Sequence, residues 1–337
     1  MKEELISIIV PVHNQQEFLP HCIAAITAQT YRTLEIILID DGSTDDSGRI
    51  CDEFAAQDNR VQVIHQENQG AWSARNAGQE AATGSYLFFP DGDDYFHPDF
   101  LRTMHRAINS DGFKYDLAVC RIMKTTTRAE FFPTTSSTSS SSSSSSSSFP
   151  SVRVLSQKDL MTGLFSTGDI TFCPQWNKLY RAEALAGLRS RAYVRGEDRD
   201  FQMRLFLRLK QAVLVDKVLY YWYQHPYSLT HEPGSVMLSY SCRVKMDYLN
   251  YKDLSERNCY RSLLLHDLYK HMALWKAAAR GTKDKHSVWK ACTTYEKATR
   301  RAYLTCPGVN PFTKWFVLTL LHCPALMKLG LKLTHNG

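Results

Sequence analysis

Short apolar runs alternate with amphipathic stretches from the N-terminus to about Lys124. The runs are near-continuous in Ile, Val, Leu, Phe and Tyr, as is typical of strands buried on both faces of a sheet. They occupy residues 5–10, 34–40, 61–66, 86–91 and 115–122. The amphipathic stretches predict helices over about 17–29, 45–57, 71–82 and 98–109. This alternation predicts an α/β fold with a doubly wound, mostly parallel sheet flanked by helices.

Polar segments follow the first four predicted strands. They read "PVHN", "DDGS", "ENQG" and "DGDD" in chain order. Because ligands of such sheets bind at the carboxyl ends of the strands, we expect all four segments to meet at one ligand-binding edge.

The second half of the chain predicts fewer strands and more helix. A helix begins near Glu197, and "AVLVDKVLYYWYQ" predicts two short strands. From about Ser235 onward the pattern is helical. We therefore predict a first domain over residues 1–233 and a helical C-terminal region over 234–337. A Ser-rich segment at about 134–148 has too little apolar surface to pack and predicts a disordered insertion.

Composition narrows the classes of partner. The chain has 337 residues, a net charge of +6 and a pI of about 8.7, with Lys and Arg spread along it. This gives no reason to expect nucleic acid, whereas phosphates or anionic lipid suit the balance. Nine cysteines without a CxxC pair, and a first apolar run that predicts a strand, favour free thiols in a cytoplasmic protein.

Three acidic residues stand within four positions in "YLFFPDGDDYF". Asp91 and Asp93 flank Gly92, and such close carboxylates repel one another unless a positive charge lies between them. Their oxygens suit Mg²⁺ or Mn²⁺, which commonly bridges to phosphate. An acidic turn at a strand end would show the same residues, so the spacing alone leaves both interpretations open.

Two further segments at the same edge carry candidate ligand contacts. Asp40 and Asp41 precede a turn at Gly42, where they predict either a simple turn with a helix cap or carboxylates that bind a base or sugar. Gly70 permits a tight turn before a helix that carries Arg75. Arg75 is either a surface charge or a nucleotide contact.

Six segments together resemble family-2 glycosyltransferases with the GT-A fold. They occur in the order typical of that family and span residues 5 to about 231. The segments are "SIIVPVHN", "EIILIDDGSTDDS", "NQGAWSARNAG", "GSYLFFPDGDD", "WNKLYRAEAL" and "RGEDRDF".

The resemblance implies a nucleotide site. Pro11 and His13 match the uracil pocket, although His13 stands where the family usually has Tyr. Asp41, with Asp40 beside it, matches the carboxylate that binds the uracil edge. Further nucleotide contacts are implied for Asn68 and Arg75.

The resemblance also implies a metal site and a base. Asp91 would contact ribose and diphosphate and share the metal with Asp93, while Asp94 would support them. Asp198 matches the general base, with Glu197 next to it. The cofactor would be a divalent metal ion, Mn²⁺ or Mg²⁺.

The implied activity is inverting transfer of a hexosyl or N-acetylhexosaminyl group from a UDP-sugar donor. The acceptor would be a hydroxyl of a glycan or lipid-linked molecule, in cell-surface polysaccharide synthesis. One alternative is a metal-dependent nucleotidyltransferase, which more often has a Gly-rich, basic loop after the first strand. The other is a non-catalytic sugar-nucleotide-binding protein, which loss of Asp93 or Asp198 would have favoured.

Three other features are open to two interpretations each. Trp176 suits an acceptor pocket or a core position. His225 and His231, which follow the last predicted strand, resemble a loop that closes over the donor, or lie in a surface loop. The tail, residues 312–333, has thirteen uncharged residues between Lys314 and Lys328, too few to span a bilayer. It predicts peripheral contact with the inner face of the cell membrane, or packing on the protein.

Overall fold

The computed structural model describes residues 3–112, 115–126, 149–166, 170–193, 195–225, 235–254, 260–307 and 309–323. Contacts divide the chain into two compact units. Unit 1 comprises Met1–Ala192 with Glu197–His225, and unit 2 comprises Tyr193–Gly196 with Pro226–Gly337. The Ser-rich segment at 134–148 and the predicted boundary at 233/234 lie outside the described residues.

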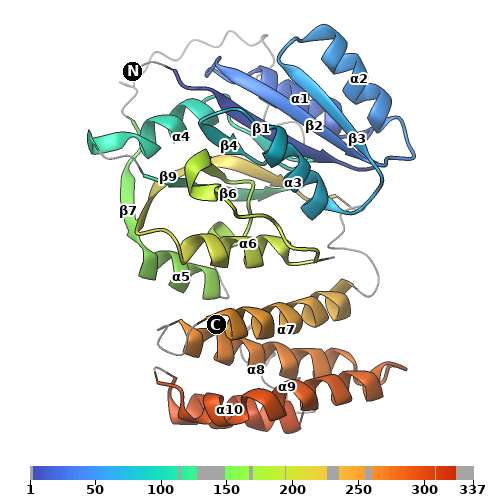
Figure 1. Ribbon diagram of the computed structural model, residues 1–337, viewed down its shortest axis with the longest axis vertical. Coiled ribbons are helices and arrows are strands. Elements are labelled where there is room, and N and C mark those ends of the chain that lie inside the picture. Colours follow the sequence, from blue (N-terminus) through green and yellow to red (C-terminus); the bar gives the residue numbers. More distant parts are fainter. Residues whose placement is uncertain are drawn as a thin grey trace. The chain divides into compact units, whose positions relative to one another are not determined.

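The first half of unit 1 alternates strands and helices as predicted. Its four neighbouring strands pair in parallel in the order β3-β2-β1-β4. The elements are β1 (Ile6–Val12), α1 (Leu19–Thr27), β2 (Leu34–Asp41), α2 (Ser47–Gln57), β3 (Val61–Gln66), α3 (Ala71–Ala81), β4 (Tyr86–Phe88) and α4 (Phe100–Ile108). The predicted α/β fold class, with a central sheet flanked by helices, is confirmed (Figure 1).

The second half of unit 1 extends the same sheet in mixed orientation. The order continues β4-β8-β6-β9-β5, and β7 also pairs with β9. Only the β6–β9 pair is parallel among the described pairs of this half. The elements are β5 (Tyr95–Phe96), η1 (Ser110–Gly112), β6 (Leu117–Thr125), β7 (Val152–Ser156), α5 (Gln157–Phe165), η2 (Ile170–Phe172), β8 (Lys178–Arg181), η3 (Ala182–Leu185), α6 (Glu197–Phe206) and β9 (Gln211–Tyr223).

The prediction of two short strands within "AVLVDKVLYYWYQ" is wrong. β9 is one strand of 13 residues because it pairs with β6 along much of its length. The polar residues Asp216 and Lys217 lie at a register shift, since Cys120 pairs with Val215 and Arg121 with Val218.

The core of unit 1 covers both faces of the sheet. Every residue of β1 is buried, as the continuous apolar run predicts. Helices α1 and α4 pack with β1, β2 and β4 in one hydrophobic cluster, while α3 contacts β1 and β2. Trp176 belongs to this core, since it is buried and stacks on Tyr220 with ring centroids 4.4 Å apart. The core interpretation of Trp176 is therefore confirmed.

Unit 2 is helical, as predicted for the C-terminal region. It contains α7 (Ser235–Asp253), α8 (Arg261–Ala278), α9 (Lys285–Thr305) and α10 (Pro311–His322). Helix α8 contacts each of the other three and is its central helix (Figure 1). None of the helices in the described ranges combines the length and the apolar character that crossing a bilayer requires.

Candidate functional site

The acidic turn after β4 is fixed to strand β9. Asp94 is fully buried and accepts hydrogen bonds from the Tyr220 hydroxyl and the Tyr223 backbone N–H, both at 2.9 Å. The same Tyr220 oxygen accepts from the backbone N–H of Asp91 at 3.2 Å. Asp94 therefore supports the turn, and Tyr220 is a second support that the sequence did not reveal.

The middle of the acidic turn, at Gly92, lies against the side chain of Gln15. A Cβ atom on Gly92 would lie 2.2 Å from Oε1 of Gln15 and 3.5 Å from the carbonyl oxygen of Pro11. The segment after β1 thus packs directly against the turn after β4. This contact places the predicted nucleotide residues and the predicted metal residues at one edge of the sheet, as the strand order predicts.

The turn gathers three carboxylates. One oxygen each of Asp91, Asp93 and Asp94 lies within 4.8 Å of the others. Burial raises the pKa of Asp91 to about 6; Arg75 opposes this shift, while Asp93 adds to it. The pKa of Asp94 is also raised, by burial and by the charges of Asp93 and Asp91. A group of hard oxygen donors whose negative charges repel one another fits a divalent cation.

His225 joins this group from the end of β9. Its Nε2 lies 2.9 Å from Oδ2 of Asp93, and its ring stacks on Phe18 with centroids 4.3 Å apart. The side chain is buried. These contacts exclude the surface-loop interpretation of His225, whereas His231 lies outside the described residues.

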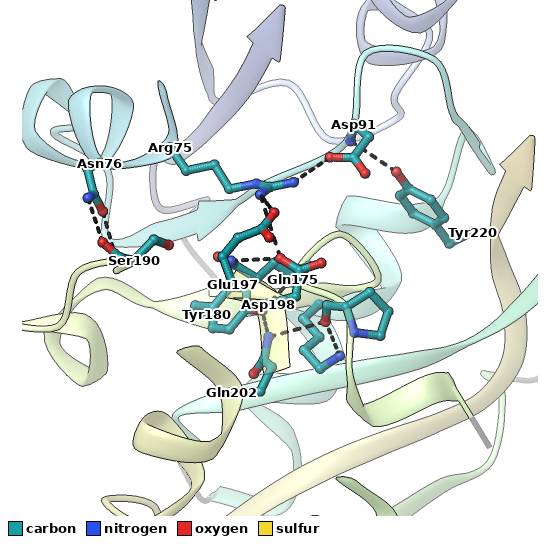
Figure 2. A network of polar contacts seen from close by, with 12 residues as sticks. Arg75, Asn76, Asp91, Gln175, Tyr180, Ser190, Glu197, Asp198, Gln202 and Tyr220 are labelled. Atoms are coloured by element: carbon teal, nitrogen blue, oxygen red, sulfur yellow. Dashed lines mark hydrogen bonds and ion pairs between the residues drawn. The ribbon is translucent and has the colours of Figure 1, made fainter. Parts of the chain in front are cut away.

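Arg75 connects the acidic turn to helix α6. It is only 4% exposed, which excludes a solvated surface charge. Its guanidinium lies 2.7 Å from Asp91, 3.2 Å from Glu197 and 3.6 Å from Asp198, as Figure 2 shows. These three carboxylates raise the pKa of Arg75 against the opposing effect of burial. The nucleotide contact suggested for Arg75 stays a prediction.

Glu197 and Asp198 open helix α6, where the helix dipole favours negative charge. Burial raises the pKa of Glu197 to about 7; Asp198 adds to the shift and Arg75 opposes it. Asp198 accepts a hydrogen bond from Nε2 of Gln175 at 2.8 Å (Figure 2). The two acids thus differ in their partners, although they are neighbours in the sequence.

Gln175 is held in place by a buried turn. The Lys178 ammonium donates to the carbonyls of Thr171 at 2.9 Å and Pro174 at 2.5 Å, and to the side-chain oxygen of Asn177 at 2.8 Å. Gln175 and Lys178 are both fully buried. Gln175 could not be singled out from the sequence, since an uncharged amide before a core tryptophan has no distinctive pattern.

The carboxylate of Asp41 holds the loop before α3. It accepts hydrogen bonds from Gln66 Nε2 at 2.6 Å and from the backbone N–H groups of Gln69 and Gly70 at 3.0 and 2.7 Å. Gly42 takes a φ of +67°, and a Cβ there would lie 2.7 Å from the backbone nitrogen of Asn68. Asp41 thus shapes the predicted base pocket by fixing its loop, in addition to any contact with a base.

Asp40 turns toward strand β3 instead. It accepts from the Ser43 backbone N–H at 3.0 Å and pairs with Nδ1 of His65 at 2.9 Å. Burial alone would raise the pKa of Asp40, but these hydrogen bonds lower it below its usual value. His65 also contacts Asp52 at 3.1 Å, and its two acidic partners raise its pKa. Asp40 therefore supports the sheet at the ends of β2 and β3 through its contacts with Ser43 and His65.

The remaining predicted pocket residues lie together at the ends of β1 and β3. His13 Nδ1 is 2.9 Å from the carbonyl oxygen of Asp41, and its Nε2 is 3.0 Å from Nδ2 of Asn68. His13 and Asn68 are exposed, whereas Pro11 is buried. An exposed imidazole held at both nitrogens presents a flat ring on which a base can stack.

The protein-family model "Glycosyl transferase family 2" matches residues 7–189 of the chain. The glycosyltransferase EpsJ of Bacillus subtilis, itself uncharacterized, is 32% identical over 234 residues, which are 68% of this chain and 64% of that protein. The chain covers smaller shares of other curated relatives, such as 30% of the glycosyltransferase GlyA of Streptococcus pneumoniae.

Solved structures show the same fold at low sequence identity. Residues 1–349 of Staphylococcus aureus TarS, in complex with UDP-GlcNAc, align with a TM-score of 0.54 and 16% identity, over 88% of this chain and 92% of that one. The mannosyltransferase PcManGT of Pyrobaculum calidifontis, in complex with GDP-Man and Mn²⁺, aligns with a TM-score of 0.55 and 14% identity, over 94% and 85%.

Proposed function

Because the chain belongs to glycosyl transferase family 2, we propose that it transfers a hexosyl or N-acetylhexosaminyl group from a UDP-sugar to an acceptor hydroxyl with inversion. The observation that carries this proposal is the Arg75 network, which joins the acidic turn after β4 to the acids that open α6. Donor-binding and proton-accepting carboxylates are thus held within one connected group.

Asp91 and Asp93 would hold a divalent cation, Mn²⁺ or Mg²⁺, with Asp94 as their buried support. When bound, such a cation stabilises the negative charge that develops on a departing diphosphate. The His225 imidazole beside Asp93 would orient that carboxylate. The exposed His13 ring and Asn68 would bind the base, above a loop that Asp41 fixes. Support for a nucleotide-sugar donor also comes from the structures of TarS with UDP-GlcNAc and PcManGT with GDP-Man.

Asp198 would accept the proton of the attacking hydroxyl. An alcohol is a weak nucleophile until a base within hydrogen-bond reach removes its proton. Gln175 donates to one oxygen of Asp198, which orients the carboxylate and leaves the other oxygen for the acceptor. Glu197, whose pKa burial raises to about 7, is the second candidate for this role.

The two alternative functions are less well supported. A nucleotidyltransferase does not need a second pair of carboxylates on a separate helix, held beside the first by a buried arginine. A protein that only binds sugar nucleotides has no use for a hydrogen-bonded base at Asp198. The match to glycosyl transferase family 2 favours the transferase over both.

We further propose a glycan or lipid-linked acceptor, and a role in cell-surface polysaccharide synthesis at the inner face of the cell membrane. The support is the family membership and the surface of unit 2 described below.

Donor hydrolysis tests the proposed reaction without knowledge of the acceptor. Assayed with a panel of UDP-sugars and GDP-mannose, the protein is expected to release UDP from one UDP-sugar. The rate should fall at least tenfold after chelation with EDTA and recover with Mn²⁺, because the cation stabilises the leaving diphosphate. Release of pyrophosphate from a nucleoside triphosphate and sugar phosphate would instead support the nucleotidyltransferase.

Replacing Gln175 by Met should lower the rate of transfer at least tenfold. The change removes a hydrogen bond to a charged group, worth about 1.5–3 kcal/mol, and keeps the side chain's length.

The control for Gln175→Met is Gln157→Met. Gln157 also donates to neighbouring groups, the carbonyls of Phe206, Leu207 and Leu209, but has no hydrogen bond to Asp198 in the described residues. If both variants lose activity to the same extent, Gln175 is structural only.

A further inference from the structure

We propose that the outward faces of α9 and α10 form a docking surface for an anionic lipid bilayer. The proposal deepens the proposed function, since a lipid-linked acceptor would be reached at such a surface. Binding to vesicles does not itself depend on catalysis, so the two proposals can fail separately.

Helix α10 exposes large aromatic side chains along one face. Phe312 is 69% exposed, Trp315 60% and Phe316 44%. Their spacing of three and four residues places them on one side of the helix. The opposite side is buried through Val317 and Leu321. Exposed bulky aromatic groups gathered on one helix face mark a binding surface rather than ordinary solvent contact.

Lys314 does not take part in this surface. The side chain is buried, and its ammonium donates to the carbonyl oxygens of Leu304 and Cys306 at 3.2 and 2.5 Å. These oxygens lie at the end of α9, where the helix dipole favours a positive charge. Lys314 therefore fastens the start of α10 to the end of α9.

The two helices run side by side in opposite directions. At the other end of α10, Nε2 of His322 lies 3.0 Å from Oε1 of Glu296 in α9. Both helices contact α8, as the arrangement of unit 2 in Figure 1 also shows. Because the buried sides of α9 and α10 both face α8, the exposed sides of these two helices lie next to each other. Residues 324–333 of the predicted tail lie outside the described residues.

The outward side of α9 is positively charged. Lys290, Lys297 and Arg301 are exposed and, at spacings of seven and four residues, fall on one stripe of the helix that ends in exposed Leu304. The only acidic residue from Lys285 to Cys323 is Glu296. It is buried and already contacts Arg300 and His322. The surface thus offers cations beside aromatic groups without an exposed acid.

An anionic bilayer is the partner that this combination fits best. Aromatic rings favour the boundary between acyl chains and headgroups, and each nearby Lys or Arg strengthens binding to anionic lipid about fivefold. A basic groove for nucleic acid would not need bulky exposed aromatics on the neighbouring helix. A protein partner would be recognised without dependence on lipid charge.

The test is co-sedimentation of the full-length chain with vesicles of phosphatidylcholine, with and without phosphatidylglycerol. We expect binding to the anionic vesicles at low salt and at least tenfold weaker binding to neutral ones. Phe312→Ser with Trp315→Ser should lower binding at least tenfold, and so should the triple change of Lys290, Lys297 and Arg301 to Gln.

The matched control removes three exposed cations from unit 1, by changing Lys158, Lys210 and Lys217 to Gln. It alters the net charge equally and should bind within twofold of the unchanged protein. Equal losses in the control would mean that total charge, not this surface, attracts the vesicles. Absence of sedimentation, or self-association that the aromatic variant abolishes without any vesicle binding, would overturn the proposal. Donor hydrolysis without vesicles should be the same in all these variants.

Discussion

Replacing Asp198 by Asn should abolish most glycosyl transfer, by at least a hundredfold, while UDP still binds within about twofold of the unchanged affinity. An amide cannot accept the proton of the attacking hydroxyl, and general base catalysis typically contributes 10²–10⁴-fold. Asn keeps the shape of Asp and the contact with Gln175. Initial rates of transfer, together with calorimetry of UDP binding, measure the two effects separately.

Glu197→Gln is the matched comparison for Asp198→Asn. Both changes remove a carboxylate that lies beside Arg75 at the start of α6. If Glu197→Gln causes the larger loss of transfer, Glu197 is the base. If UDP binding is lost along with activity in Asp198→Asn, that residue belongs to the donor site or to the stability of the fold.

Asp93→Asn should lower turnover at least a hundredfold in saturating Mn²⁺ and weaken Mn²⁺ binding measured in the presence of UDP. The reason is the loss of a charged oxygen from the group formed by Asp91, Asp93 and Asp94. The melting temperature without metal should not fall. The change relieves repulsion between neighbouring carboxylates, and the Asp93 side chain remains partly exposed.

Asp216→Asn serves as the control, because this exposed carboxylate pairs with Arg121 on the surface of the sheet. Its turnover and its Mn²⁺ binding should match those of the unchanged protein. Full turnover of Asp93→Asn in Mn²⁺ would exclude Asp93 as a metal ligand.

The first half of the fold could be read from the sequence because its strands are local and three of them are almost completely buried, whereas β3, at the edge of the sheet, is only partly covered. In β1 every side chain is apolar or covered, so the pattern has few alternative interpretations. The position of the polar turns could also be predicted, because the residues that follow parallel strands all lie at the same edge of the sheet. β9 was misjudged because its polar pair is absorbed by register shifts in β6, which lies far away in the chain.

The connections within the site could not be predicted, because they join distant segments. Arg75 lies 122 residues before Glu197, and His225 lies 132 residues after Asp93. No periodicity links such pairs. Gln175 was missed for a different reason: its importance comes from the buried turn that aims it, and a glutamine in the sequence carries no charge pattern that would mark it.

The position of Arg75 also affects how the residues of this site can change during evolution. One guanidinium supplies counter-charge to the turn after β4 and to both acids at the start of α6. A substitution at position 75 would leave three carboxylates without their shared counter-charge at once, whereas a neutral replacement at any one of them would still leave two carboxylates beside the arginine. Position 75 is therefore expected to vary less than the exposed His13 and Asn68, where the proposed base pocket can change without disturbing this buried group.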